Sequence, residues 1–194
     1  KKAAKALKQP RTQLKTAPAY FIMLLILVLD QLTKTLVRVN MEMYEHIPLL
    51  QNLFGDTFIL IRVQNSGAAF SFGFGSDLVN RIIFICVTVL VVGIIIYLLH
   101  YAQHKIQVIA FGLILGGALG NLIDRVLFGP VTDFFSMDFP DFIMERFPVF
   151  NIADSSIFIG VVLMIIDMLF IKDKPSPLPE TGEHIEISEF NKEL

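Results

Sequence analysis

Four aspartates stand out because each lies within or beside a long apolar stretch: Asp30, Asp124, Asp133 and Asp154. An ionised side chain at membrane depth costs roughly 2.5–3.5 kcal/mol on insertion scales, so each is a candidate for chemistry. Two carboxylates held together in a poorly hydrated site cannot both ionise easily, and one of them keeps a proton. Such a pair offers a base and an acid at the same pH, which suits the hydrolysis of a peptide bond by activated water.

A structural alternative stays open for each of these acids, as a helix cap or a salt-bridge partner. Asp154, near the start of an apolar stretch, is well placed to stabilise a helix N-terminus. The residues alone do not choose Asp133 over Asp124 as the second member of a pair, because Asp124 lies closer to the end of an apolar stretch.

Other hydrolytic chemistries lack their residues. The sequence has no H-E-x-x-H motif, and no serine lies in a G-x-S-x-G motif. Its single cysteine, Cys86, lies inside an apolar stretch and far from any histidine, which excludes a disulfide within the chain and a cysteine-ligated metal site. No pattern typical of a metal or nucleotide site is present, so we expect no cofactor.

Three amides, Asn65, Asn121 and Asn151, are expected at the same outer ends of the apolar stretches as the acids. Amide groups both donate and accept hydrogen bonds, so they can hold carboxylates or an extended peptide backbone. A further group of glycines, Gly112, Gly116 and Gly120 with Gly117 beside them, is typical of a helix face that packs closely against a neighbour.

The elements that would position these residues are four apolar stretches: 17–39, 82–99, 106–123 and 153–171. Each is close to the roughly 20 residues that a helix needs to cross the hydrocarbon core. Of the 194 residues, 54% are hydrophobic, and the mean hydropathy is +0.64. This composition predicts a mainly α integral membrane fold with four transmembrane helices. The first stretch lacks a small-residue cleavage site, so we interpret it as a retained span rather than a signal peptide.

Positive charge sets the expected orientation. The first fifteen residues carry six Lys or Arg residues and no acid, and basic residues recur in the connection 100–105 and after the fourth stretch. Beside apolar spans, these charges indicate the cytoplasmic side rather than a nucleic-acid arm. Both termini are then cytoplasmic, and the four aspartates share the outer face of the membrane.

The connections predict a small extracytoplasmic layer. Residues 57–63 are β-branched and apolar, and 64–67 read as a turn, so a small β-sheet with a loop is expected on the outer membrane face. The connection 126–151 contains three prolines and is expected to be loop with little helix. We divide the chain into a basic cytoplasmic N-terminus (1–16), a four-span domain (17–171) and an acidic, disordered cytoplasmic tail (172–194).

Five blocks of the sequence carry a resemblance to a known family. They are Asp30-Gln31-Leu32-Thr33-Lys34, Asn65-Ser66-Gly67-Ala68-Ala69-Phe70, Gly116-Gly117-Ala118-Leu119-Gly120-Asn121-Leu122-Ile123-Asp124-Arg125, Val131-Thr132-Asp133-Phe134 and Phe150-Asn151-Ile152-Ala153-Asp154-Ser155-Ser156. In this order, and on four spans, the blocks resemble lipoprotein signal peptidase, or signal peptidase II, over residues 17–171. Thr132 departs from the family's commoner valine, and the connection between the last two blocks is slightly long.

The resemblance implies that Asp133 and Asp154 are the catalytic pair of an aspartyl endopeptidase. It also implies a supporting framework, in which Asp124 and Arg125 form an ion pair that fixes the segment carrying Asp133. The other residues that it implies as substrate-binding or supporting are Asp30, Lys34, Asn65, Gly67, Asn121, Asn151 and Ala153.

The implied substrate is a prolipoprotein whose signal peptide spans the membrane and whose cysteine already carries diacylglycerol, with cleavage before that cysteine. The resemblance further implies a multi-pass protein of the bacterial inner membrane. We expect membrane lipid but no nucleic acid as a partner, and a monomer.

Two other functions compete with this one. A proton- or ion-coupled transporter could use Asp30, Asp154 and Asp167 as a relay, but transporters usually contain a repeat between their halves, and none is visible here. A catalytically inactive chaperone or receptor for lipoproteins is disfavoured because both positions of the pair are aspartates.

Overall fold

The computed structural model describes residues 15–49, 51–55, 57–67, 76–138 and 146–171. The expected disordered tail, nearly all of the basic N-terminus, and Ala68-Ala69-Phe70 of the second sequence block lie outside these ranges. The elements in chain order are α1 (Ala17–Asn40), β1 (His46–Pro48), α2 (Gln51–Phe54), β2 (Phe58–Asn65), α3 (Asp77–Leu99), α4 (Lys105–Leu127), β3 (Val131–Met137) and α5 (Ile152–Phe170).

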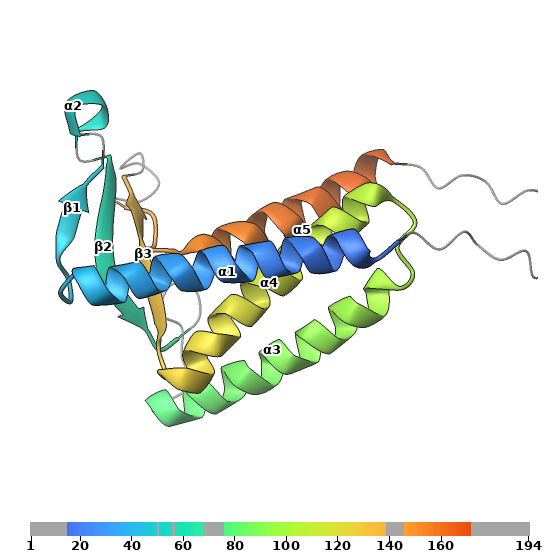
Figure 1. Ribbon diagram of the computed structural model, residues 1–194, viewed down its shortest axis with the longest axis horizontal. Helices are drawn as coiled ribbons and strands as arrows, with labels where there is room; N and C mark the ends of the chain where they lie inside the picture. Colours follow the sequence, from blue (N-terminus) through green and yellow to red (C-terminus); the bar gives the residue numbers. More distant parts are fainter. Residues whose placement is uncertain (1–14, 50, 56, 68–75, 139–145, 172–194) are drawn as a thin grey trace, which may run out of the picture.

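Four long helices form a bundle with a small sheet at one end (Figure 1). α1, α3, α4 and α5 are each long and apolar enough to cross a membrane, which confirms the predicted mainly α membrane fold. α1 ends and α5 begins at the end of the bundle that carries the sheet (Figure 1). The acids predicted to share one membrane face therefore lie at one end of the molecule.

Two helix boundaries differ from the predicted spans. α3 begins at Asp77 rather than at residue 82, because Ser76 caps the helix and its Oγ accepts a hydrogen bond from the Val79 N–H at 3.4 Å. α4 continues to Leu127 rather than ending at residue 123, because the charged Asp124 remains helical and finds its partners inside the protein. A charge therefore does not end a span when a buried counter-charge meets it.

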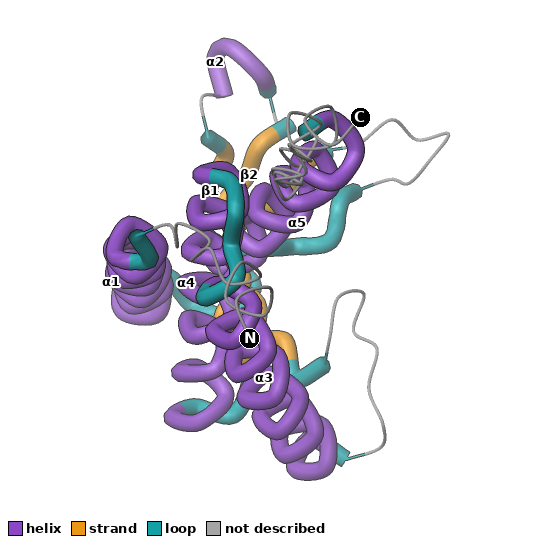
Figure 2. The backbone as a smooth tube through the Cα atoms, turned by 90° about the vertical axis from the view of Figure 1, so that its right-hand side faces the viewer, coloured by secondary structure: helices purple, strands orange, loops and turns teal. Residues whose placement is uncertain are grey.

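α4 lies between the other three long helices and packs against each of them (Figure 2). Its glycines allow the close approach of α1. A Cβ atom at Gly112 would lie 2.7 Å from the Ala19 carbonyl oxygen, and one at Gly116 would lie 2.7 Å from the Ile26 Cβ. The prediction that these glycines form a packing face is confirmed.

Gly117 faces α5 instead, and its replacement by alanine is expected to destabilise the protein. The new Cβ would lie 2.3 Å from the Ala153 carbonyl oxygen, and backbone cannot move aside cheaply. We expect a loss of about 1–3 kcal/mol in the free energy of unfolding, measured by thermal denaturation in detergent. Gly93→Ala is the matched control, since a Cβ there has no neighbour within 4 Å. Equal melting of the two variants would contradict this packing.

The sheet is antiparallel, with the strand order β1-β2-β3. The strand predicted at 57–63 is confirmed within β2, but the turn predicted at 64–67 is wrong at its start. Gln64 and Asn65 continue the strand and pair with Thr132 and Val131. Those partners belong to β3, which lies in the connection that we expected to be loop. The pattern of 57–63 indicates a strand but not its partner, because pairing depends on contacts that neither segment reveals by itself.

A tight turn leads from α4 into β3. The peptide N–H groups of Phe128 and Gly129 both donate to the Asp124 carbonyl oxygen, at 2.8 and 3.1 Å. Gly129 has a φ of +95°, which a residue with a side chain rarely adopts. The turn therefore places the start of β3 directly over the end of α4.

Candidate active site

Asp133 and Asp154 line one cavity of about 980 Å³ at the sheet end of the bundle. Asp133 projects from β3, and Asp154 lies in the first turn of α5. Two further elements supply polar lining: β2 contributes Asn65, and α4 contributes Asn121 and Arg125. Aromatic and aliphatic side chains, among them Phe150, make up much of the remaining wall.

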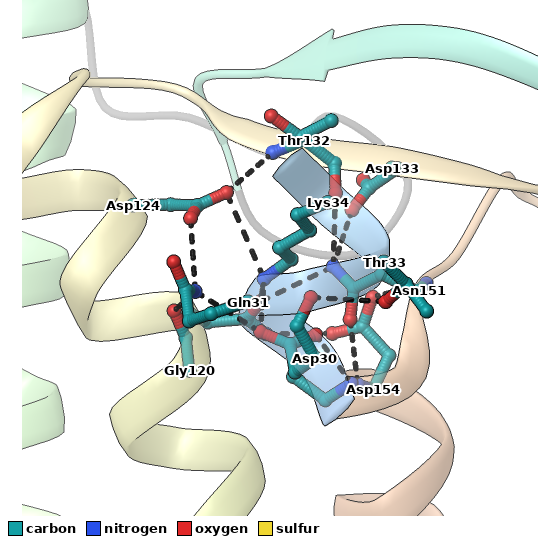
Figure 3. Close-up of polar contacts among 12 residues, drawn as sticks. Asp30, Gln31, Thr33, Lys34, Gly120, Asp124, Thr132, Asp133, Asn151 and Asp154 are labelled. Carbon is teal, nitrogen blue, oxygen red and sulfur yellow. Dashed lines mark hydrogen bonds and ion pairs between the residues drawn. The ribbon is translucent and has the colours of Figure 1, made fainter. Parts of the chain in front are cut away.

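Asn151 joins the two carboxylates (Figure 3). It is the N-cap of α5, and its Oδ1 accepts a hydrogen bond from the Asp154 N–H at 2.9 Å. Its own backbone N–H donates to Asp154 Oδ2 at 3.2 Å, which completes a capping box. Its Nδ2 donates to Asp133 Oδ1 at 2.7 Å. One fully buried asparagine thus contacts both carboxylates, that of Asp133 through its side-chain amide and that of Asp154 through its backbone N–H.

A second amide holds each carboxylate from the other side. Asn65 Nδ2 donates to Asp133 Oδ2 at 3.0 Å, and Asn121 Nδ2 donates to Asp154 Oδ1 at 2.8 Å. The three amides singled out in the sequence therefore all contact the pair. The structure brings them together from β2, α4 and the start of α5.

Burial is the main influence on the protonation of Asp133. The residue is 2% exposed, and removal of its carboxylate from water, reinforced by the negative charge of Asp154, raises the pKa of Asp133 to about 7. The hydrogen bonds from Asn65 and Asn151 act in the opposite direction and limit the rise in that pKa. A proton is therefore held on this pair of carboxylates near neutral pH, so the site can offer an acid and a base together.

A buried lysine anchors the site to α1. Lys34 Nζ lies 2.9 Å from Asp30 Oδ2 and 3.7 Å from Asp124 Oδ2, and all three side chains are fully buried. The same ammonium donates to Asn121 Oδ1 at 2.8 Å. Because Asn121 uses its other end to hold Asp154, the lysine sets the orientation of that amide.

Asp30 bridges α1 to the start of α5. Its Oδ1 accepts a hydrogen bond from the Ala153 N–H at 2.9 Å, in the first turn of α5, where a negative charge is favoured. The site residues Asp30 and Ala153 are thus direct partners. Gln31 adds a link to α4, because its Nε2 donates to Asp124 Oδ1 at 3.1 Å and to the Gly120 carbonyl oxygen at 3.0 Å.

Asp124 fixes the segment that carries Asp133, but the predicted ion pair between Asp124 and Arg125 is wrong. Among the described residues, Asp124 pairs with Lys34 and with Arg38, whose Nη1 lies 3.3 Å from Asp124 Oδ1. Successive residues of a helix point in different directions, so Asp124 and Arg125 serve different sides of α4. Asp124 Oδ2 accepts the Thr132 N–H at 2.9 Å, one residue before Asp133.

Arg125 faces the cavity and the second sequence block. Its Nη2 donates to the Gly67 carbonyl oxygen at 3.1 Å, and its guanidinium lies 5.0 Å from the centre of the Phe84 ring. The Gly67 N–H in turn donates to Asn65 Oδ1 at 3.0 Å, so Gly67 and Asn65 form one turn. Arg125 therefore holds the end of β2 rather than the segment of Asp133.

Gln31 and Arg38 belong to the site but were not predicted as site residues. Arg38 Nη1 also donates to Thr132 Oγ1 at 3.1 Å, so the departure from the family pattern at Thr132 has a specific partner in this chain. A helical signal was present. Residues 30, 31, 34 and 38 fall on one face of a helix, and a polar stripe of this kind on a span is expected to face protein rather than lipid.

Asp167, the inner acid of the alternative ion relay, lies away from the other acids. It is near the opposite end of α5, where Oδ1 is 2.9 Å from His104 Nδ1 and Oδ2 accepts from Gln107 Nε2 at 2.5 Å. These contacts tie α5 to the start of α4. Both oxygens are used in this way, so the structure offers no support for a relay from Asp167 to Asp154.

Both the sequence and the fold of this chain are similar to those of known proteins. The family model described as "Signal peptidase (SPase) II" matches residues 22–170. A lipoprotein signal peptidase of Halothermothrix orenii is 42% identical over 148 residues, which cover 76% of this chain and 92% of the relative. One of Bacillus subtilis is 37% identical over 156 residues, covering 80% and 95%. A bacterial membrane enzyme solved by the in meso method at 2.3 Å resolution has a TM-score of 0.70 and 29% identity, covering 84% of this chain and 97% of that enzyme.

Proposed function

Because this chain belongs to the signal peptidase II family, the lipoprotein signal peptidases, we propose that Asp133 and Asp154 are its catalytic pair. Membership gives the chain the activity of an aspartic peptidase that processes prolipoproteins, as a multi-pass membrane protein. The observation that carries the assignment is that both carboxylates line one cavity and both accept hydrogen bonds from Asn151.

The geometry suits different catalytic roles for the two acids. We assign the shared proton to Asp133, the more deeply buried partner, and the role of base to Asp154. Asp154 takes a proton from water, the resulting hydroxide adds to the scissile carbonyl carbon, and Asp133 donates its proton to the departing amide nitrogen as the C–N bond breaks. Asn65, Asn121 and Asn151 keep the two carboxylates in place during these transfers.

The substrate that we propose is a prolipoprotein whose cysteine carries diacylglycerol, cut immediately before that cysteine. Apolar side chains on α5, such as Ile157 and Phe158, line the cavity next to Asp154 and suit a signal peptide that enters from the membrane. Lipid chains would hold the scissile bond at the membrane surface, which confines the search to a plane and raises the local concentration.

We further propose that the protein works as a monomer in the bacterial inner membrane. The positive charges of the N-terminus and of Lys172 and Lys174 support cytoplasmic termini, with the cavity toward the outer leaflet. We assign the peptidase domain to residues 17–171, an assignment that the family match over 22–170 supports.

The pH dependence of cleavage tests the assigned proton. If Asp133 must be protonated and its pKa is about 7, kcat/KM falls as the pH rises through 7, and about tenfold per unit well above it. The experiment is a gel-shift assay with purified protein in lipid and a diacylglyceryl-modified prolipoprotein, between pH 5 and 9. A chelator is included, because two carboxylates need no metal for this chemistry. A rate that still increases at pH 9 would contradict the assignment.

A further inference from the structure

The pairing of β2 with β3 contains a bulge next to the site. Phe58, Ile59 and Leu60 pair with Met137, Ser136 and Phe135, and the register then shifts, so that Val63 pairs with Asp133. Ile61 and Arg62 therefore lie together opposite the single residue Phe134. One extra residue in one strand defines a β-bulge, and bulges are common where a strand must aim a functional side chain.

The shift decides which face of the sheet Asn65 occupies. Side chains alternate along a strand, so Val63 and Asn65 share a face with their partners Asp133 and Val131, and all four line the cavity. If the first register continued, Asp133 would lie opposite Arg62, and Asn65 would project from the opposite face. A slip of one residue reverses every side chain of a strand. The hydrogen bond from Asn65 to Asp133 therefore depends on the bulge.

Arg62 ties the bulge to the end of α1. Its Nη1 donates to the Met41 carbonyl oxygen at 2.7 Å and to the Arg38 carbonyl oxygen at 3.1 Å. Carbonyl groups in the last turn of a helix lack partners within it and carry partial negative charge, which a guanidinium satisfies. The backbone of Arg62 is also held, since its N–H donates to the Glu45 carbonyl oxygen at 3.2 Å and its carbonyl oxygen accepts the Tyr44 N–H at 2.9 Å.

One atom of this side chain is left unsatisfied. Among the described residues, Arg62 Nε is buried without a hydrogen-bond partner. An unpaired buried donor costs free energy, so stability alone gives a poor account of an arginine at this position. A better explanation is that Arg62 holds the bulge in place relative to α1, the helix that also carries Asp30 and Lys34.

We propose that Arg62 is a positioning residue for the aspartate pair: it fixes the bulge of β2 to the end of α1 and so keeps Asn65 bonded to Asp133. The proposal rests on the function proposed for Asp133. It assigns no contact with substrate to Arg62, which does not line the cavity.

The charged groups around Asp133 give the sign of the expected effect. Lys34 faces it from α1, Arg125 from α4 and Asp154 from α5, while Asn65 and Asn151 contribute neutral amides. Because the hydrogen bond from Asn65 favours the ionised carboxyl group, its loss moves the pKa of Asp133 further upward. The alkaline limit of activity then moves to higher pH.

The experiment compares Arg62→Met, Asn65→Ala and the double variant in pH profiles of kcat/KM, with rates normalised to folded protein. We expect each single variant to lose about tenfold in kcat/KM at pH 6 and to shift the alkaline limit upward by about half a unit or more. The double variant should be no worse than the poorer single variant, because both substitutions break the same hydrogen bond. Arg62→Lys should restore part of the activity.

Arg81→Met is the matched control. Arg81 Nη2 donates to the Val126 carbonyl oxygen at 2.7 Å, so this arginine also caps a helix end, but it touches neither the sheet nor the cavity. We expect its pH profile to be unchanged and its kcat/KM to stay within about twofold of wild type.

An unchanged pH profile in Arg62→Met, or full additivity with Asn65→Ala, would overturn the proposal. If Arg62→Met does not fold, Arg62→Gln, which lacks the charge and is shorter, is measured in its place, and an unchanged pH profile in that variant overturns the proposal in the same way. Failure of the proposed function is distinguished by Asp133→Asn. If that variant cleaves normally, the catalytic assignment falls; if it is inactive while Arg62 variants behave as wild type, only the role of Arg62 falls.

Discussion

Replacement of either Asp133 or Asp154 by asparagine is expected to lower the rate of prolipoprotein cleavage by about a thousandfold or more. Asparagine keeps the size of the side chain but can neither take a proton from water nor give one to the leaving nitrogen. Since both transfers occur in the same reaction, neither variant keeps a useful fraction of the activity. The gel-shift assay with a lipid-modified prolipoprotein measures this loss directly.

Both variants are expected to remain folded. In Asp154→Asn, the amide oxygen can still accept the Asn151 N–H, and the N-cap bond from the residue 154 N–H to Asn151 Oδ1 is a backbone bond that the substitution does not remove. In Asp133→Asn, removal of a buried, partly ionised group relieves its desolvation. Melting temperatures close to wild type, measured in the same detergent, would separate lost chemistry from lost structure.

Asp167→Asn is the control in the same helix. It changes a carboxylate of α5 at the end of the bundle away from the cavity, where its partners are His104 and Gln107. We expect some loss of stability and cleavage within about threefold of wild type. Normal cleavage by Asp133→Asn or Asp154→Asn would refute the catalytic pair, and a dead Asp167→Asn would show that the assay reports folding.

The spans were predictable because hydrophobic length is a local property of the sequence. The apolar stretch 17–39 corresponds to α1 almost residue for residue, and 153–171 to α5. The prediction was wrong where a charge was taken as the end of a span. Asp124 stays helical because Lys34 and Arg38, which are far away in the sequence, neutralise it. Neutralisation by a distant partner cannot be read from the helix that carries the charge.

The choice between Asp124 and Asp133 shows the same limit in the site. Proximity to a helix end favours Asp124, and the resemblance alone favoured Asp133. In the structure, the carboxylate of Asp124 contacts Lys34 and Arg38 and accepts the Thr132 N–H. Asp133 instead lines the cavity with Asp154. The difference arises from β3, and its pairing with β2 is a contact between segments remote in sequence. Local patterns do not carry that information.

Lys34→Met is expected to be the most destabilising substitution in the framework. The ammonium is fully buried between Asp30 and Asp124, so its removal leaves two buried carboxylates with one fewer cation. Loss of one partner from a buried ion pair typically costs about 3–5 kcal/mol, because the remaining charge stays in a medium of low dielectric constant. Thermal denaturation in detergent, with Lys105→Met as an exposed-lysine control, measures the difference.

A double variant separates charge from packing. In Asp30→Asn/Lys34→Met, one carboxylate leaves together with the ammonium, and Asp124 still has Arg38 at 3.3 Å. If buried charge is the cause, the double variant should recover part of the stability that Lys34→Met loses. Cleavage should not recover, since Asn121 has lost the ammonium that orients it toward Asp154. A Lys34→Met protein that melts like wild type would mean that Asp30 and Asp124 are satisfied by their amide and arginine partners alone.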